Sequence, residues 1–151
     1  AKAAQQNDVN EEYTLTQAID TLVKTGVSVH TFQVNNWFDC GKKETLLATN
    51  AILLAEAEYA SEEIPFFDNT IILHPVSIGK GCLIENSIIG PHVTIGNNTT
   101  IKSSVVKESI IGSYTTLDEV VLDNSLIGSD ASVKGLSRSL NIGDNTEIDF
   151  G

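Results

Sequence analysis

The second half of the sequence repeats itself, and this repeat restricts the possible folds more than any other property of the chain. Three eleven-residue segments align without gaps: IENSIIGPHVT from Ile84, VKESIIGSYTT from Val106 and LDNSLIGSDAS from Leu122. Aliphatic residues recur every five or six positions, and glycine follows many of them directly. This period fits neither an α-helix, which repeats every 3.6 residues, nor a simple strand, which alternates with a period of two.

A chain that turns by a third of a circle every six residues completes a coil after about eighteen residues. Aliphatic side chains then stack inside the coil, with adjacent strands about 4.8 Å apart, and glycines relieve the tight corners. The fold class is therefore predicted as mainly β, a hexapeptide-repeat parallel β-helix. Four coils are expected from Ile72 to about Gly135, with a fifth coil or a cap over 140–150. The predicted inward residues are Ile72, Ile78, Ile84, Ile89, Ile95, Ile101, Val106, Ile111, Leu117, Leu122, Ile127 and Val133, with smaller Val76, Cys82, Val93, Thr99, Thr115 and Ala131 between them.

The first part of the sequence has the pattern of an α/β domain. Residues Leu15, Ala18, Ile19, Leu22 and Val23 follow the spacing of one buried helix face, with Thr14 or Thr16 as the N-cap and Gly26 as the stop. The alternating stretch 27–34 predicts a strand, and a second helix is expected over about 44–59. The predicted domains are the end of a larger α/β domain over 1–58, a linker over 59–70 anchored by Phe66 and Phe67, and the β-helix over 71–151.

Composition argues against several classes of function. The net charge is −11, which makes the chain a poor electrostatic partner for nucleic acid or an anionic membrane surface. No apolar run approaches the roughly 18 residues of a membrane span. The two cysteines, Cys40 and Cys82, do not form a disulfide framework, which indicates a reducing compartment. We therefore expect a cytoplasmic protein without a nucleic-acid or membrane partner.

The stretches EYTLTQAIDTLVKTG and WFDCGKKETLLATNAILL, followed by hexapeptide repeats, resemble the C-terminal part of the sugar-phosphate nucleotidylyltransferases. The long glucose-1-phosphate thymidylyltransferase type is the most similar, and its relatives act on mannose-1-phosphate or glucose-1-phosphate. The resemblance runs from Glu11 to about Ile148 and is most specific at 37–50. Gln17 departs from it, because the family often has an aspartate there. The resemblance implies that the β-helix is left-handed and follows the remnant of a nucleotidyltransferase catalytic domain.

The resemblance also implies a reaction. The intact enzyme would join a nucleoside triphosphate, dTTP by this resemblance, to a sugar-1-phosphate, here glucose-1-phosphate, and release pyrophosphate. It would use Mg²⁺, a hard cation that takes carboxylate and phosphate oxygens. Asp39 is implied as a metal ligand, Glu12 as a residue near the sugar, and Trp37 as a wall of the substrate pocket.

The chain contains no glycine-rich phosphate loop, no second metal carboxylate in a recognisable context and no basic phosphate cradle. We therefore expect it to be the C-terminal piece of a longer enzyme, without a catalytic residue of its own and inactive alone. The resemblance implies that the β-helix forms a homo-oligomer, with a trimer as one arrangement, or carries a regulatory surface.

Other interpretations stay open at this point. Asp39 could simply order the turn before the helix, and Cys40 is expected to be a small buried thiol. A β-helix of this kind is also the fold of acyltransferases that use acetyl-CoA and a histidine general base. His92 is the candidate base, although no long loop and no basic cluster for a CoA phosphate accompany it. A purely structural assembly domain is the third possibility.

Overall fold

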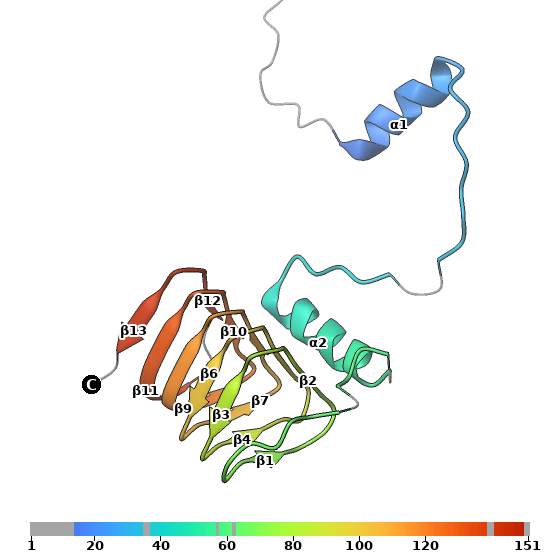
Figure 1. The fold of residues 1–151 in the computed structure, drawn as a ribbon. Helices are drawn as coiled ribbons and strands as arrows, with labels where there is room; N and C mark the ends of the chain where they lie inside the picture. The colour runs from blue at the N-terminus through green and yellow to red at the C-terminus, as the bar shows by residue number, and fades with distance from the viewer. Residues whose placement is uncertain (1–13, 35–36, 57, 62, 139–140, 150–151) are drawn as a thin grey trace, which may run out of the picture. The chain divides into compact units, whose positions relative to one another are not determined.

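The computed structural model describes residues 14–34, 37–56, 58–61, 63–138 and 141–149. The chain divides into two compact units, residues 1–37 and residues 38–151. The second unit is a coil of short, stacked parallel strands with one helix beside it (Figure 1). No helix in the described ranges is long and apolar enough to cross a membrane.

The strands form a three-sided coil. One sheet has the order β12-β10-β8-β5-β2, and the other has the order β1-β4-β7-β9-β11-β13, with β3 and β6 beside this path. Strand β9 bends around a corner, so that its first half pairs with β6 and its second half with β7. The strands are β1 (Ile71–Ile72), β2 (Val76–Ile78), β3 (Leu83–Glu85), β4 (Ile88–Ile89), β5 (Val93–Ile95), β6 (Thr100–Lys102), β7 (Val105–Lys107), β8 (Ile110–Ile111), β9 (Thr116–Asp123), β10 (Leu126–Ile127), β11 (Ser132–Arg138), β12 (Asn141–Ile142) and β13 (Glu147–Asp149).

The coils are shorter than the sequence period predicts, and they shorten further toward the C-terminus. In the pairing register, Ile71 lies opposite Ile88, Thr100 lies opposite Thr116, and Ser132 lies opposite Glu147. At the corners, single residues with positive φ turn the chain. The φ angles at Asn86, Ser103 and Glu119, for example, are 51°, 47° and 56°. Corners of this kind recur in every described coil.

Most of the repeated glycines have a different role from the predicted one, whereas Gly90, with φ +104°, turns the chain as predicted. Gly79, Gly96, Gly112 and Gly128 are not in the left-handed region, and they lie where adjacent coils come into close contact. A Cβ on Gly79 would be 2.7 Å from the backbone nitrogen of Asn97 in the next coil. These glycines therefore set the spacing of the coils rather than the shape of the corners.

The interior confirms the predicted ladder. Ten of the twelve predicted aliphatic residues are buried, while Ile72 and Ile78 in the first coil are partly buried. Each fully buried side chain contributes about 1.5–3 kcal/mol relative to exposure. The buried Thr99 hydroxyl donates to Gly112 O at 2.8 Å, and the Thr115 hydroxyl donates to Gly128 O at 2.9 Å. The buried hydroxyl groups of Thr99 and Thr115 therefore have hydrogen-bond acceptors and do not interrupt the ladder.

Helix α2 (Lys43–Leu54) is shorter than the predicted helix over 44–59. Leu54 is its last buried residue, and Ala55, Glu56, Glu58 and Tyr59 are exposed. The helix therefore ends at its last buried residue.

The predicted linker covers the first coil. Ser61 N donates to Val76 O at 2.9 Å, and Ser61 Oγ accepts from Ile78 N at 3.0 Å. Ile64 and Phe67 pack against the core, whereas Phe66 is exposed. Of the two predicted anchors, only Phe67 therefore acts as one.

The first unit contains α1 (Leu15–Lys24), which Thr14 caps through a capping box with Gln17. Gly26, with φ +83°, follows the helix, as predicted. The predicted buried face is exposed, and no residue of α1 is buried. The strand predicted over 27–34 is wrong, because these residues form no strand and have no ladder partner in the described ranges. Alternation alone does not make a strand where a neighbouring strand is missing.

Candidate functional site

Helix α2 is anchored on the second coil by Asn50. The Asn50 side chain donates from Nδ2 to His92 O at 3.2 Å and accepts from Thr94 Oγ1 at 2.6 Å. Leu47 and Leu54, one turn on either side, are buried. Asn50 therefore fixes the helix to the corner before β5 and to β5 itself.

The turn that leads into α2 is closed by Asp39. Its Oδ1 accepts from Gly41 N at 3.1 Å, and the carboxylate is exposed. The Thr45 hydroxyl then donates to Lys42 O at 3.0 Å at the start of the helix. The hydrogen bond with Gly41 is the one that a turn-ordering role requires, and it uses one of the two carboxylate oxygens.

The described residues near Asp39 do not make a magnesium site on their own. Mg²⁺ requires near-octahedral oxygen coordination, usually with one or two carboxylates and substrate phosphates. In the described part of the chain, no group of three or more His, Cys, Asp or Glu side chains is placed to hold a metal ion. Asp39 can supply one carboxylate, so a second ligand would have to come from elsewhere.

The structure does not test the predicted roles of Glu12 and Trp37. Glu12 lies outside the described residues, and Trp37, which is 79% exposed, is the last residue of the first unit. Cys40 is exposed, so the expectation of a buried thiol is wrong. Cys82 packs against the core as predicted, and its partial burial raises the pKa of the thiol.

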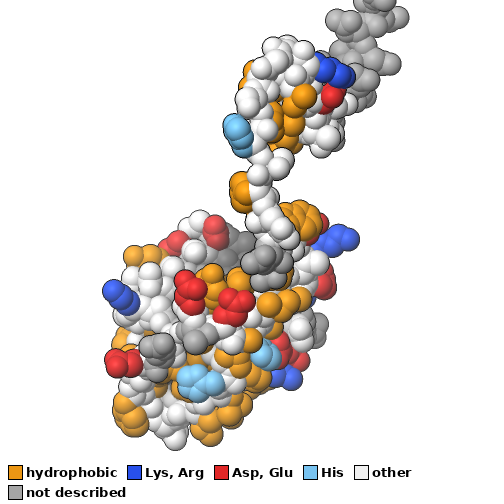
Figure 2. Space-filling model, turned by 90° about the vertical axis from the view of Figure 1, so that its right-hand side faces the viewer, with side chains coloured by type: hydrophobic (Ala, Val, Ile, Leu, Met, Phe, Trp, Pro, Cys, Tyr) orange, Lys and Arg blue, Asp and Glu red, His pale blue; other side chains and the backbone are white. Residues whose placement is uncertain are grey.

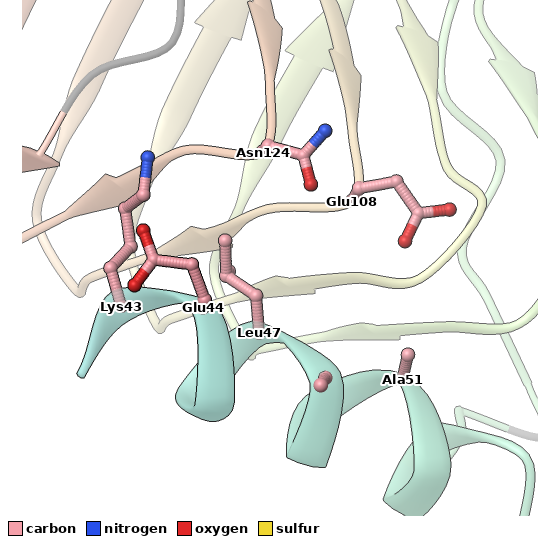
Figure 3. A pocket seen from close by; sticks show the side chains of 7 residues that line it. Lys43, Glu44, Leu47, Ala51, Glu108 and Asn124 are labelled. Atoms are coloured by element: carbon pink, nitrogen blue, oxygen red, sulfur yellow. The ribbon is translucent and has the colours of Figure 1, made fainter. Parts of the chain in front are cut away.

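A pocket that sequence reasoning missed lies between α2 and one corner of the coil (Figure 3). Its volume is about 400 Å³. On the helix side it extends from Lys43 to Ala51, next to the Asn50 anchor. The lining residues are Lys43, Glu44, Leu47, Ala48 and Ala51 from the helix, and Glu108 and Asn124 from the coil.

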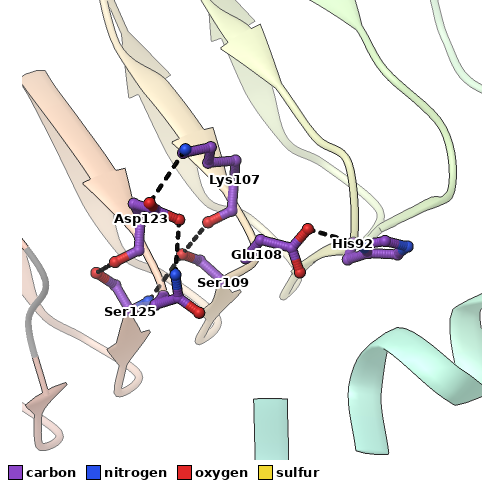
Figure 4. Close-up of polar contacts among 7 residues, drawn as sticks. His92, Lys107, Glu108, Ser109, Asp123 and Ser125 are labelled. Atoms are coloured by element: carbon purple, nitrogen blue, oxygen red, sulfur yellow. Dashed lines mark hydrogen bonds and ion pairs between the residues drawn. The ribbon is translucent and has the colours of Figure 1, made fainter. Parts of the chain in front are cut away.

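The coil side of this pocket continues into a polar network (Figure 4). His92 Nδ1 and Glu108 Oε1 are 2.8 Å apart, and both residues lie at corners with positive φ. In the neighbouring part of the network, Lys107 Nζ lies 3.1 Å from Asp123 Oδ2. A carboxylate on Nδ1 orients an imidazole in the way that a general base requires, although the same pair also tethers one coil to the next.

Replacing Asn50 by alanine is expected to loosen α2. Two hydrogen bonds to the coil are lost, which together contribute about 1–2 kcal/mol to the free energy of unfolding. Amide hydrogen exchange should become faster in α2 but not in β8 or β10. Asn141→Ala, at an exposed position of β12, is the matched control and should leave exchange in α2 unchanged. Equal exchange in both variants would show that Asn50 is not the anchor.

The similarity of this chain to known proteins lies in the coil. None of the curated proteins compared with the chain matches it. Residues 75–106, from the residue before β2 to the middle of β7, match the model of the bacterial transferase hexapeptide family (six repeats). Together with the parallel coil of about five turns, this match supports a left-handed β-helix built of hexapeptide repeats. Over these residues, the chain is similar to the bacterial transferase hexapeptide family.

Proposed function

We propose that the chain is the C-terminal part of a sugar-1-phosphate nucleotidylyltransferase, in which the β-helix serves assembly. The observation that carries this proposal is the 37–50 segment, whose sequence resembles that family and whose last residue, Asn50, anchors α2 to the coil. In this arrangement the β-helix holds one rigid helix, and the Asp39 turn lies at the start of that helix. We propose dTTP and glucose-1-phosphate as substrates and the cytoplasm as the location.

The first unit also supports the proposal. The apolar face of α1, with Leu15, Leu22 and Val23, is exposed in the described residues. Such a face on an amphipathic helix is expected to pack against another part of the protein. In the proposed enzyme this part is the body of the catalytic domain, which would also supply the remaining Mg²⁺ ligands next to Asp39. Glu12 and Trp37 would contact the sugar phosphate.

The test is to express the chain together with its upstream coding sequence and to measure pyrophosphate release. Four nucleoside triphosphates and several sugar-1-phosphates would be supplied with Mg²⁺. Asp39→Asn is the informative variant, because the amide oxygen can still accept from Gly41 N while the carboxylate is lost. We expect turnover with one substrate pair and a loss of at least about 100-fold in Asp39→Asn. Asp68→Asn, an exposed aspartate next to the coil, should retain full activity.

The outcomes separate the candidate functions. Turnover that survives Asp39→Asn would make Asp39 a turn residue. No turnover from a folded protein would favour either an acyltransferase or a purely structural domain. The acyltransferase has one specific observation in its favour, the His92–Glu108 pair beside the pocket. Acetyl-CoA should protect an acyltransferase against thermal unfolding and should have no effect on a structural domain.

A further inference from the structure

The pocket beside α2 has one apolar wall and one polar wall. On the helix, Leu47 and Ala51 point toward the coil (Figure 3), and Ala48 lines the pocket between them. The coil supplies Glu108 and Asn124. All of these residues belong to the second unit, so both walls are parts of one folded body. A volume of about 400 Å³ with an apolar wall and a few polar groups is typical of a small-molecule site.

Two alanines leave this pocket open on the helix side. Asn50 holds α2 on the coil through its hydrogen bonds to His92 O and Thr94 Oγ1, and these contacts fix the helix beside the pocket. The short side chains of Ala48 and Ala51 do not fill the space that remains. The apolar wall is therefore available to the carbon chain of a ligand, which gains free energy when it leaves water.

The charge of the pocket is set by Glu108. At the other end of the lining, Lys43 and Glu44 carry opposite charges, which offset each other. Glu108 Oε1 lies 2.8 Å from His92 Nδ1, and a neutral imidazole can donate this hydrogen bond without adding charge. The second oxygen, Oε2, accepts no hydrogen bond from the described residues. Because the Glu108 side chain is only 37% exposed, water screens its charge less than at a fully exposed position.

The surroundings of the pocket favour a cation over an anion. The net charge of the chain is −11, which attracts cations and repels anions at long range. On the face of the second unit that Figure 2 shows, acidic side chains lie among hydrophobic ones, and basic side chains lie toward the edges. A carboxylate or a phosphate would meet like charge both at long range and at Glu108. An ammonium group meets opposite charge in both places.

We propose that this pocket binds a small aliphatic ammonium compound, a primary amine with a chain of about four to six carbon atoms. The ammonium group donates to Glu108 Oε2 in a charge-assisted hydrogen bond. The carbon chain packs on Leu47, Ala48 and Ala51. This site is separate from the nucleotidylyltransferase reaction proposed above, because none of its lining residues has a role in that reaction.

Titration of the full chain with pentylamine near neutral pH, followed by ¹H–¹⁵N NMR, tests the proposal. We expect saturable shifts of the Leu47, Ala48 and Ala51 amides with a dissociation constant of about 1 mM, as is usual for so small a ligand. Three comparison compounds separate the contributions: 1-pentanol lacks the charge, pentanoate has the opposite charge, and ammonium chloride lacks the carbon chain. Each should bind about tenfold more weakly or worse. Equal affinity for any of them would overturn the proposal.

Two variants separate charge from shape. Glu108→Gln keeps an oxygen that can accept from His92 but removes the charge, and it should raise the dissociation constant by about fivefold or more. Ala51→Leu keeps a good helix former and fills the cavity, and it should raise the dissociation constant by about tenfold or more. Glu119→Gln is the matched control, because Glu119 is also a corner residue with positive φ, is exposed and does not line the pocket. This variant should bind pentylamine as the unchanged protein does.

The outcomes distinguish this pocket from general attraction to an acidic chain. Equal weakening by Glu108→Gln and Glu119→Gln would show general attraction and would overturn the proposal. Full affinity in Ala51→Leu, or no saturable shift in the unchanged protein, would do the same. Far-UV circular dichroism checks that each variant is folded, and if Glu108→Gln is not, Ala51→Leu and the three comparison compounds decide. None of these results depends on turnover, so the nucleotidylyltransferase proposal keeps its own assay.

Discussion

Replacing Gly112 by alanine is expected to destabilise the β-helix by about 3 kcal/mol, the upper part of the range for overpacking. The added Cβ would lie 2.5 Å from the carbonyl carbon of Gly128 and would also overlap the backbone nitrogen of Ser129. Both atoms belong to the backbone of the next coil, so no side-chain movement can relieve the contact. The coils would have to move apart and lengthen the bond from Gly112 N to Ile127 O, which is 2.8 Å.

Gly143→Ala is the control for this prediction. Gly143 occupies the equivalent position in the last coil, and a Cβ there would meet no atom within 4 Å. Alanine should therefore be neutral or stabilise the protein by about 0.4–1 kcal/mol, because it restricts the unfolded chain. Urea unfolding followed by far-UV circular dichroism measures both variants. Similar midpoints for the two would show that close approach of the coils does not explain the repeated glycines.

The sequence was sufficient to predict the interior of the coil. The inward residues have to be aliphatic because they are buried. Their regular spacing is therefore visible in the sequence alone. The length of each coil was predicted less well, and so were the corners, where Asn, Ser or Glu adopt positive φ. Nothing in the composition of a corner such as Ser103 or Glu119 indicates that it will turn the chain.

The pocket was missed because residues that are equivalent in the aligned eleven-residue segments are not the residues that stack on one another in the coil. In the aligned segments, Asn86, Glu108 and Asn124 are equivalent. In the coil, Ile84 stacks on Ile101, while Val106 stacks on Leu122, so the first segment lies on a different face from the second. His92, rather than Asn86, therefore neighbours Glu108. In the sequence, only the equal spacing from His92 to Glu108 and from Glu108 to Asn124 indicates that these residues follow one another at one corner of successive coils.

The start of the chain shows which features a sequence pattern does not predict. The cap at Thr14 and the stop at Gly26 are local features, and both were predicted correctly because they depend only on nearby backbone groups. The burial of the α1 face and the strand over 27–34 depend on partners elsewhere. Likewise, Asp39 has the same sequence context whether it orders a turn or binds a metal, so its hydrogen bond to Gly41 does not decide between these roles.

Replacing Leu117 by alanine is expected to lower the free energy of unfolding by about 2–5 kcal/mol. Leu117 is fully buried and pairs with Ile101 in the preceding coil and with Val133 in the following one. The backbone of each coil is held by strand pairing on both sides, so the space left by the side chain cannot close by collapse. Because the cavity stays open, the loss in the free energy of unfolding is expected to be large.

Leu83→Ala removes the same atoms from a side chain that is 67% exposed on β3, and it should cost less than about 0.5 kcal/mol. Chemical unfolding of both variants gives the difference directly. In a coil each turn contacts only its neighbours, so stability is close to a sum of turns and of the contacts between them. A central defect such as Leu117→Ala weakens two contacts between turns. If the last coils of Leu117→Ala unfold first while the first coils stay protected from hydrogen exchange, Leu117 separates two independently stable halves. A single transition would show one cooperative coil.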